Sequence, residues 1–500
     1  MMKRYLIACY MMALAGALCL GCTSDTDEVT DENGDTSGEV ITEPSDDDLV
    51  ENATFSTVVG IVYSGTTASV TNAASGVTVS QSGANVVITS TIEGVEYVLS
   101  GTTTAGSLKI YSDYKFKLNF NGVDITSTSG PAINIQSHKR VFAVLTEGTV
   151  NKLTDSSSYP TSTEDQKGCL FSEGQLIFSG SGSLTVSGKY KHAVCSDDYI
   201  LIRQGVQLTV AAAATDGIHT NEAILIEGGT VQVTSTDEGI NCDEGAVVIN
   251  DGTVTVTTKA ASAKGIKGYG NVTINGGTIN VTAKGGDSSE GIESKSVLTI
   301  NDGTVEVTAY DDCINAASGI VITGGSVYCY SSNNDGIDSN GPLTISGGLI
   351  VSSGTTSPEE GIDCDQNTFK ITGGTLVGFG GATSTPTSSA STQRSLIYGG
   401  SGTSNQYFSV VSSTGETVLV CKIPRTYSQM TLLFSSPSLT AGTSYTIYSG
   451  GTVSGGTDFH GLYTAGTYTA GTQLSTFTSS SVVTQVGNVS TGGGGQPGWR

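Results

Sequence analysis

Acidic side chains return at near-regular intervals in the middle of the chain, each followed by a glycine and an isoleucine. Lysine takes the acidic place once, and cysteine takes the glycine place once. The seven phrases begin at Asp216, Glu238, Lys264, Glu290, Asp312, Asp335 and Glu360, with spacings of 22, 26, 26, 22, 23 and 25 residues. Calcium takes about six to eight hard oxygen ligands in flexible geometry. Regularly spaced acids that a repeating fold brings together therefore indicate cation binding.

A second phrase, Gly-Gly-Thr or Asp-Gly-Thr, returns inside each period, with alternating β-branched residues around it. For example, Leu225-Ile226 precedes Gly228-Gly229-Thr230, and Val231-Gln232-Val233 follows it. A repeat of this length, with strand patterns and glycine corners, is typical of a solenoid of short strands. We therefore predict an all-β protein, a parallel β-helix with β-rich caps at both ends.

Aligning the coils on the glycine of the first phrase arranges the following residues in columns. Because side chains alternate along a strand, the isoleucine and the residue two positions later are expected to face the core. That second inward column is small: Thr220, Cys242, Gly268, Ser294, Ala316, Ser339 and Cys364. The columns expected to face solvent are His219, Asn241, Lys267, Glu293, Asn315, Asp338 and Asp363, and then Asn221, Asp243, Tyr269, Lys295, Ala317, Asn340 and Asp365.

Carboxylates stacked on successive coils repel one another, so they need a compensating positive charge. Equivalent residues on successive coils lie about 4.8 Å apart, and two carboxylates at that distance repel by roughly 3.5 kcal/mol at an effective dielectric of 20. We predict that calcium relieves this repulsion in three clusters: Asp216, Asp237 and Glu238; Glu290, Glu293, Asp311 and Asp312; and Asp335, Asp338, Glu359, Glu360 and Asp363. The alternative is that these side chains cap turns by accepting bonds from backbone N–H groups.

The cationic and aromatic residues of the two outward columns lie mid-array and are candidate ligand contacts. They are Lys267, Tyr269 and Lys295. A lysine there suits a sugar carboxylate, and the tyrosine offers a face for a sugar ring. With Lys264, the two lysines are also candidates for a base that abstracts a proton beside a uronate carboxylate. We favour binding or charge balance over the base.

Histidines and cysteines give no metal or disulfide signature. The four histidines, His138, His192, His219 and His460, are scattered, and we interpret them as structural. Lys191-His192 extends the coil array backwards, with His192 at the level of Gly217. After Cys22 an odd number of cysteines remains, with no CxxC pair. We interpret them as buried free thiols, with Cys195, Cys242 and Cys364 in the small inward column.

The N-terminus reads as a processing signal rather than as part of the fold. Lys3-Arg4 precedes an apolar run that ends in Gly21-Cys22 and resembles a bacterial lipobox, which makes Cys22 the lipidated residue. The acids that follow resemble the surface-export tag of Bacteroidetes lipoproteins. We expect an outer-membrane lipoprotein at the cell surface, in contact with the membrane only through its lipid anchor. The net charge of −24 argues against nucleic acid as a partner.

Composition and pattern divide the chain into seven segments of an expected monomer. They are a signal peptide (1–22), a disordered acidic tether (23–53), an N-terminal β cap (54–125), the β-helix (126–380), a linker (381–393), a β-rich C-terminal cap (394–488) and a Gly-rich tail (489–500).

Several motifs together resemble one known family. They are residues 97–101, 148–155, 167–174, Lys191-His192 with Asp197-Asp198, and 216–219. They look like the polygalacturonate-binding β-helix family of carbohydrate-binding proteins, which is similar to pectate lyases, and the resemblance covers roughly residues 55–480. It implies a right-handed parallel β-helix that binds calcium and an acidic, pectin-like polysaccharide. A calcium-dependent polysaccharide lyase acting by β-elimination, and an adhesin or structural spacer, remain as alternatives.

Overall fold

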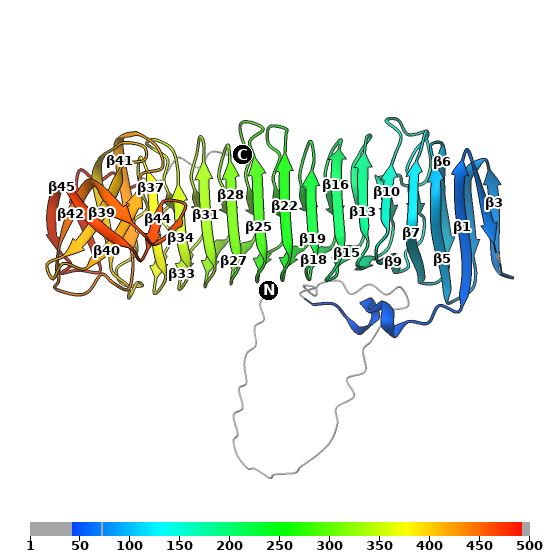
Figure 1. The fold of residues 1–500 in the computed structure, drawn as a ribbon, viewed down its shortest axis with the longest axis horizontal. Helices are drawn as coiled ribbons and strands as arrows, with labels where there is room; N and C mark the ends of the chain where they lie inside the picture. The colour runs from blue at the N-terminus through cyan, green and yellow to red at the C-terminus, as the bar shows by residue number, and fades with distance from the viewer. Residues whose placement is uncertain (1–42, 72–73, 493–500) are drawn as a thin grey trace, which may run out of the picture. The chain divides into compact units, whose positions relative to one another are not determined.

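A computed structural model describes residues 43–71 and 74–492 as a stack of parallel β-coils followed by an antiparallel sheet (Figure 1). The predicted parallel β-solenoid is thereby confirmed. These residues belong to one compact unit, 40–500. The predicted signal peptide, the lipidated Cys22, the first part of the tether and most of the Gly-rich tail lie outside the described residues.

One face of the solenoid is a 13-stranded sheet that receives one short strand from each coil. Its first two strands pair antiparallel, and each later strand pairs parallel with the strand of the next coil. In order, the strands are β3 (Val77–Ser82), β4 (Ala84–Ser90), β6 (Gly106–Ser112), β8 (Ile133–Ile135), β11 (Gly168–Ser172), β14 (His192–Ser196), β17 (Ile218–Thr220), β20 (Ile240–Cys242), β23 (Ile266–Gly268), β26 (Ile292–Ser294), β29 (Ile314–Ala316), β32 (Ile337–Ser339) and β35 (Ile362–Asp363).

The remaining strands of the coils form a 27-stranded sheet with two stacks. The long strand β7 (Phe116–Thr126) joins them, because its first half pairs with β9 and its second half with β10. The first stack is β9 (Val141–Leu145), β12 (Leu176–Gly180), β15 (Tyr199–Ile202), β18 (Ala223–Ile226), β21 (Ala246–Ile249), β24 (Val272–Ile274), β27 (Val297–Ile300), β30 (Gly319–Ile322), β33 (Leu343–Ile345) and β36 (Phe369–Ile371). The second is β10 (Val150–Thr154), β13 (Ser183–Gly188), β16 (Gln207–Ala213), β19 (Thr230–Thr234), β22 (Thr253–Thr258), β25 (Thr278–Ala283), β28 (Thr304–Ala309), β31 (Ser326–Ser331), β34 (Leu349–Ser353) and β37 (Thr375–Gly380).

At both ends of the 27-stranded sheet, antiparallel pairs join the parallel stacks. At the N-terminal end, β1 (Thr57–Gly65) pairs antiparallel with β2 (Thr67–Thr71) and parallel with β5 (Val95–Thr103). At the other end, β37 pairs antiparallel with β41 (Tyr427–Ser435), which pairs with β38 (Ser395–Gly402), and β46 (Val483–Gly487) follows. The second stack therefore ends against antiparallel strands of the C-terminal cap rather than at an exposed coil.

The register predicted from the Gly-Ile phrases is confirmed from β17 to β35. Ile218 pairs with Ile240, and the same column continues to Ile362, buried throughout. In six of the seven coils a glycine precedes the isoleucine, and close packing between coils explains why, while Cys313 takes this place in the coil of Ile314. A Cβ on Gly217 would lie 2.6 Å from the carbonyl oxygen of Gly239 and 2.2 Å from a methyl of Val233. A side chain at Gly217 would therefore need its neighbours to shift.

The register differs from the prediction by one residue at the coil of His192. Cys195 pairs with His219, so His192 lies level with Asp216 rather than with Gly217. Cys195 is therefore not in the small inward column with Cys242, although it is fully buried. This coil lacks a Gly-Ile phrase, so nothing in its sequence fixes the register. The seven described cysteines are all free and buried, as predicted.

The end of the predicted tether is folded against the solenoid, a correction to the boundary at residue 53. Two 3-10 turns, η1 (Asp46–Asp48) and η2 (Val50–Asn52), occupy this segment. The buried Asp48 carboxylate lies 2.9 Å from Arg140 Nε and accepts a hydrogen bond from Tyr199. Apolar side chains of the same segment pack on the outer face of the first stack: Val50, Ala53 and Phe55. The sequence pattern did not reveal this because the partners are far away in the chain.

The C-terminal cap contains a six-stranded antiparallel sheet, and its apolar cluster continues into the last coils of the solenoid through Val351, Val377 and Phe379. Its strands, in order, are β43 (Thr457–Phe459), β44 (Leu462–Thr464), β40 (Thr417–Lys422), β39 (Tyr407–Ser412), β42 (Ser444–Ser454) and β45 (Thr467–Thr478). Within the part of the chain that the structure describes, no helix has the length and apolar character needed to span a membrane.

Candidate functional site

The repeated acidic residues form one column at a corner of the solenoid, directly before the strands of the 13-stranded sheet. Backbone hydrogen bonds set their spacing, as where Gly217 N–H donates to the Glu238 carbonyl at 2.9 Å. We call the set the acidic column: Asp216, Glu238, Lys264, Glu290, Asp312, Asp335 and Glu360. Most of these side chains are buried or half-buried. The fold therefore stacks the carboxylates as the sequence predicted.

At the start of the acidic column, Asp216 is surrounded by nitrogen atoms. Its Oδ2 lies 2.7 Å from His219 Nδ1 and 3.5 Å from His192 Nδ1, and accepts a bond from Asn241 Nδ2 at 3.1 Å. The two imidazole rings stack with centroids 4.1 Å apart. Burial would raise the pKa of Asp216, but these partners outweigh it and hold that pKa below its usual value. Burial lowers the pKa of His192 to about 4.

Two groups of three side chains, among the described residues, bring one ligand atom each to within 4.8 Å of one another. One is Asp216, Asp237 and Glu238, which is the first predicted calcium cluster. The other is His192, Asp216 and His219, whose histidines the sequence had suggested to be structural. The corrected register at His192 explains the omission, because only that register places His192 beside Asp216.

Further along the acidic column, carboxylates face other carboxylates. Burial and neighbouring acids raise the pKa values of Asp312 and Asp335 well above the usual range. The same causes raise the pKa values of Glu290 and Asp338 to about 7 and that of Glu360 to about 9. These groups have too little positive charge around them to ionise easily.

Part of this set caps backbone groups, as the alternative interpretation predicted. Asp312 Oδ1 accepts a bond from Asp335 N–H at 3.0 Å, and the Asp335 carboxylate accepts one from Glu360 N–H. These backbone caps leave several carboxylate oxygens without a hydrogen bond. Within residues 43–71 and 74–492, the Oε2 atoms of Glu290, Glu293 and Glu360 are buried without a hydrogen-bond partner. These oxygens are of the type that a hard cation such as calcium takes. The two groups of three ligand atoms within 4.8 Å, among the described residues, both lie at the start of the column, so the structure does not gather the second and third predicted clusters around one point.

The other predicted calcium ligands lie along the same corner, and their assignment stays a prediction. Asp311 accepts a bond from Asn334 Nδ2 at 2.6 Å, and Asp363 accepts one from the Ser384 hydroxyl at 2.8 Å. Burial raises the pKa of Glu359, and the charges of Asp311 and Asp363 add to the effect. A carboxylate of the second cluster, Asp311, therefore affects the pKa of one of the third, Glu359, although the two lie on different coils.

Each candidate lysine is paired with a carboxylate near the acidic column. The pairs are Lys264 with Glu290 at 3.0 Å, Lys267 with Glu238 at 3.7 Å, and Lys295 with Glu293. Although burial by itself would lower the pKa of Lys295, the hydrogen bond and charge of Glu293 raise it. A catalytic base must lose its proton near the working pH. These ion pairs therefore favour binding or charge balance over proton abstraction.

The first outward column is less exposed than strict alternation predicts. Asn241 and Glu293 are only 5% and 3% exposed, because side chains on neighbouring coils cover one another. Most side chains of the second outward column are exposed, among them Tyr269, with 62% of its surface exposed. Tyr269 follows β23, the strand of Lys267, and it lies one coil from Lys295, whose N–H donates to the Gly268 carbonyl. The three residues therefore lie on two neighbouring coils, where the Lys267 and Lys295 side chains pair with carboxylates and the Tyr269 ring is exposed.

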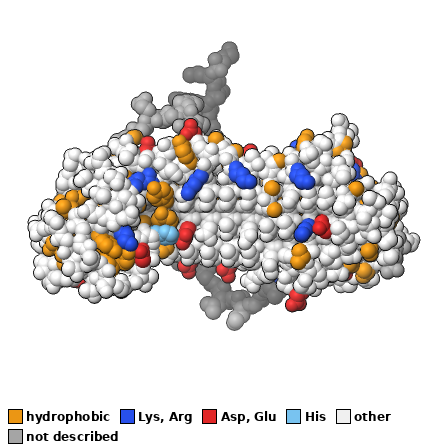
Figure 2. Space-filling view, turned by 45° about the horizontal axis from the view of Figure 1, so that its top comes forward, with side chains coloured by type: hydrophobic (Ala, Val, Ile, Leu, Met, Phe, Trp, Pro, Cys, Tyr) orange, Lys and Arg blue, Asp and Glu red, His pale blue; other side chains and the backbone are white. Residues whose placement is uncertain are grey.

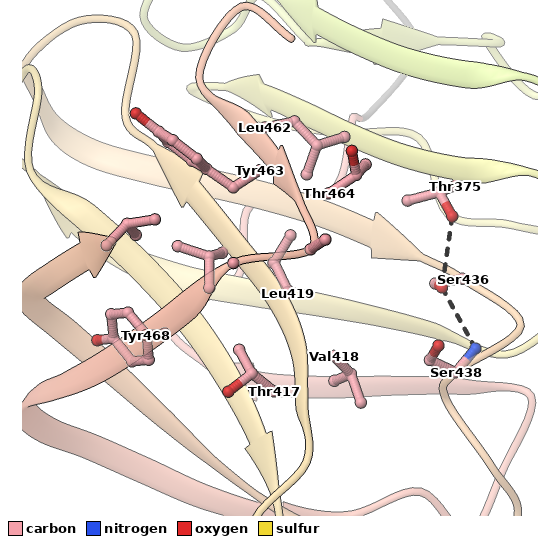
Figure 3. Close-up of a pocket in the computed structure, with 14 residues that line it drawn as sticks. Thr375, Thr417, Val418, Leu419, Ser436, Ser438, Leu462, Tyr463, Thr464 and Tyr468 are labelled. Carbon is pink, nitrogen blue, oxygen red and sulfur yellow. Dashed lines mark hydrogen bonds between the residues drawn. The ribbon is translucent and has the colours of Figure 1, made fainter. Parts of the chain in front are cut away.

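A cavity in the C-terminal cap offers no comparable chemistry. It has a volume of about 210 Å³, and its lining contains no acidic, basic or histidine side chain. Figure 3 shows hydrogen bonds linking Thr375, Ser436 and Ser438 on one side, with Tyr463 and Tyr468 across from them. On the face drawn in Figure 2, most of the surface is neither charged nor apolar, and only a few charged side chains are scattered over it. The acidic column is the better candidate.

The chain is similar to known proteins in sequence and, with a low TM-score, in structure. The sequence model of a family described as carbohydrate-binding domain-containing protein matches residues 82–336 and 286–421. A protein of that description from Acetivibrio thermocellus is 31% identical over 121 residues, which is 23% of this chain and 42% of the relative. The chain thus spans less than half of that relative. A solved polysaccharide lyase-like protein from C. thermocellum, a gadolinium derivative, is similar at 23% identity and a TM-score of 0.35, covering 58% of this chain and 92% of the other.

Proposed function

Since the chain belongs to the family of carbohydrate-binding domain-containing proteins, we propose that it binds an acidic, pectin-like polysaccharide through calcium held in the acidic column. The observation that carries the proposal is the set of buried carboxylates from Glu290 to Glu360, with oxygens left unpartnered on Glu290, Glu293 and Glu360 among the described residues. Bound calcium would neutralise these groups and supply positive charge for a sugar carboxylate.

The residues around the exposed ring give this chain its own contacts with the polysaccharide. Tyr269 offers a ring face to a sugar, since aromatic rings pack well against apolar surfaces and hold cations by their faces. Lys267, two residues before Tyr269, and Lys295, on the next coil, would supply positive charge by turning from their carboxylate partners to the sugar. A uronate carboxylate that approaches this point meets a lysine, whereas a neutral glucan gains only the ring contact. Preference for an acidic polymer follows.

Retention in an affinity gel tests this function. The full chain should be retarded by polygalacturonate in the presence of calcium, and much less by a neutral glucan. No unsaturated, ultraviolet-absorbing product should accumulate, because the lysines are held in ion pairs. Equal retardation by the neutral glucan would refute the acidic ligand, and accumulation of the unsaturated product would show a lyase instead. An adhesin or spacer would give neither retardation nor product.

We further propose that Cys22, outside the described residues, is lipidated and anchors the protein to the outer membrane with the folded domain exposed at the cell surface. Lys3-Arg4, the apolar run and Gly21 directly before Cys22 support this. Cys22→Ala should leave the precursor unlipidated and move the protein out of the membrane fraction. Unchanged partition of this variant, measured by fractionation and immunoblotting against the parent, would contradict the proposal.

A further inference from the structure

We propose that His192, Asp216 and His219 form a separate site for a borderline divalent cation of the Zn²⁺ class. The three residues come from two neighbouring coils. His192 opens β14, Asp216 is level with it on the next coil, and His219 lies in β17. The inference does not rest on polysaccharide binding or on calcium, because its ligands include two imidazoles that a calcium site would not use.

The distances suit a metal with short bonds. With Zn–N and Zn–O bonds of about 2.0–2.1 Å, the ligand atoms of a tetrahedral site lie roughly 3.4 Å apart. His192 Nδ1 and Asp216 Oδ2 are 3.5 Å apart. His219 Nδ1 is closer to Asp216 Oδ2, at 2.7 Å, because a hydrogen bond joins them. A metal ion would replace the proton of that bond, which would leave to solvent.

The stacked imidazoles hold the two nitrogen ligands in place. Their rings are 16° from parallel, with centroids 4.1 Å apart, so the two Nδ1 atoms turn toward the same carboxylate. The Thr215 hydroxyl, 3.0 Å from His192 Nδ1, is the group that must yield to a metal. A hydroxyl can rotate away at small cost, because it is both donor and acceptor.

Residues that are not themselves ligands hold His219 and Asp216 in position. The other ring nitrogen of His219, Nε2, lies 3.6 Å from Asp243 Oδ2, and metal-bound histidines commonly direct their second nitrogen to a carboxylate. Asn241 Nδ2 donates to Asp216 at 3.1 Å and to Asp243 at 3.0 Å. Asn241 is 5% exposed, and its Oδ1 has no hydrogen-bond partner within the described residues. This buried polar atom lies beside the proposed site and lacks a protein donor.

The ligand types separate this site from the carboxylate group that shares Asp216. Imidazole suits zinc, copper, iron and nickel, whereas sites made only of carboxylates and carbonyls suit calcium and magnesium. Asp237 and Glu238 complete the all-carboxylate group, and His192 and His219 complete the other. Substitutions of the histidines and of Glu238 therefore distinguish the two sites.

Cobalt(II) is a suitable probe because its visible absorption reports a low coordination number. The full chain, treated with chelator and dialysed, should bind Co²⁺ with a visible band, and Zn²⁺ should displace it. Thiolate charge-transfer absorption should be absent, because the cysteines are buried. His192→Gln and His219→Gln should each weaken Co²⁺ binding by more than about tenfold, since even changes behind the ligands cost 10- to 100-fold.

Two matched controls keep the test specific. His138→Gln removes a histidine whose side chain is 83% exposed and far along the chain from the site, and Co²⁺ affinity should stay unchanged. Glu238→Gln removes a negative charge near Asp216 but no proposed ligand, so it should weaken Co²⁺ binding less than either histidine variant does. Thermal melts without metal confirm that each variant is folded. Absence of Co²⁺ binding by the parent, or parental affinity in a folded His219→Gln variant, would overturn the site.

Discussion

At the start of the acidic column one carboxylate, Asp216, faces two imidazoles and an amide, whereas toward its end carboxylates mainly face one another. The pKa of Asp216 is held low by those partners, while that of Glu360 is raised to about 9 by burial and by neighbouring acids. The corner and the backbone geometry are the same in both places. The side chain three residues after the acid makes the difference: His219 at one end and Asp363 at the other.

This difference shows how one repeating backbone can build unlike sites. The coil fixes where the side chains of a column lie, but each coil selects which charges meet. A buried carboxylate without a counter-charge is costly, so it either takes up a proton or binds a cation. We therefore expect the last coils to depend strongly on calcium and the coils around Asp216 to depend on it less.

The largest expected effect is loss of thermal stability on chelation. A ligand present at 100 times its Kd stabilises the folded state by about 2.7 kcal/mol. Chelator should lower the melting temperature and added calcium should restore it. Asp335→Asn with Asp338→Asn should shrink this calcium response, because two carboxylates of the last cluster lose their charge. Asp251→Asn, an exposed acid outside the column, is the control. A melt unmoved by chelator, with no calcium in the native protein, would leave these acids only as turn caps.

The next effect is the pH dependence of the chelated protein. The pKa of Glu360 is about 9 when folded and its ordinary value is 4.5, so the folded state keeps a proton that the unfolded state has lost. Stability from this group is therefore complete below about pH 4.5 and is lost as pH rises toward 9. Glu360→Gln should flatten that decline in chemical denaturation measured from pH 5 to pH 9. An unchanged slope would mean that Glu360 ionises freely.

A smaller effect of opposite sign is expected at the start of the column. The pKa of His192 is about 4 when folded and 6.5 ordinarily, so the unfolded state binds the extra proton first. Stability from this group is complete above about pH 6.5 and is lost as pH falls toward 4. His192→Gln should reduce the loss of stability between pH 6.5 and pH 4, with chelator present. If this variant instead changes the slope above pH 7, the two ends of the column are not distinct.

Most of the solenoid was readable from its sequence because its corners admit only particular residues. Where a glycine precedes the isoleucine, as at Gly217, a Cβ would lie too close to the carbonyl of the next coil, so aligning Gly217 with Gly239 also aligned the columns beside them. Where that phrase is absent, the register was wrong by one residue, and the contact between His192 and Asp216 was missed. Local pattern determines register only where the backbone itself constrains the residue.

The exposure of side chains and the contacts between distant parts of the chain could not be predicted from local sequence pattern. Alternation placed Glu293 on the outer face, but neighbouring coils cover it, and its charge is balanced by Lys295. The segment before residue 54 reads as a tether because it is acidic, yet Asp48 is buried beside Arg140. Such contacts depend on which residue lies opposite in space, and sequence spacing alone does not contain that information.

The most direct test of the account measures affinity for polygalacturonate at fixed calcium in the parent and in Lys267→Ala with Lys295→Ala. The double variant removes the positive charge beside Tyr269 without touching the isoleucine core. We predict weaker binding by the double variant and weaker binding of the parent in chelator or high salt. Because Lys295 balances the buried Glu293, the double variant should melt at a lower temperature than the parent, and binding is compared where a melt in calcium shows both to be folded. A double variant that binds with the parent's full affinity, or a parent whose affinity is unchanged by chelator, would contradict the claim that calcium and these lysines hold the polysaccharide.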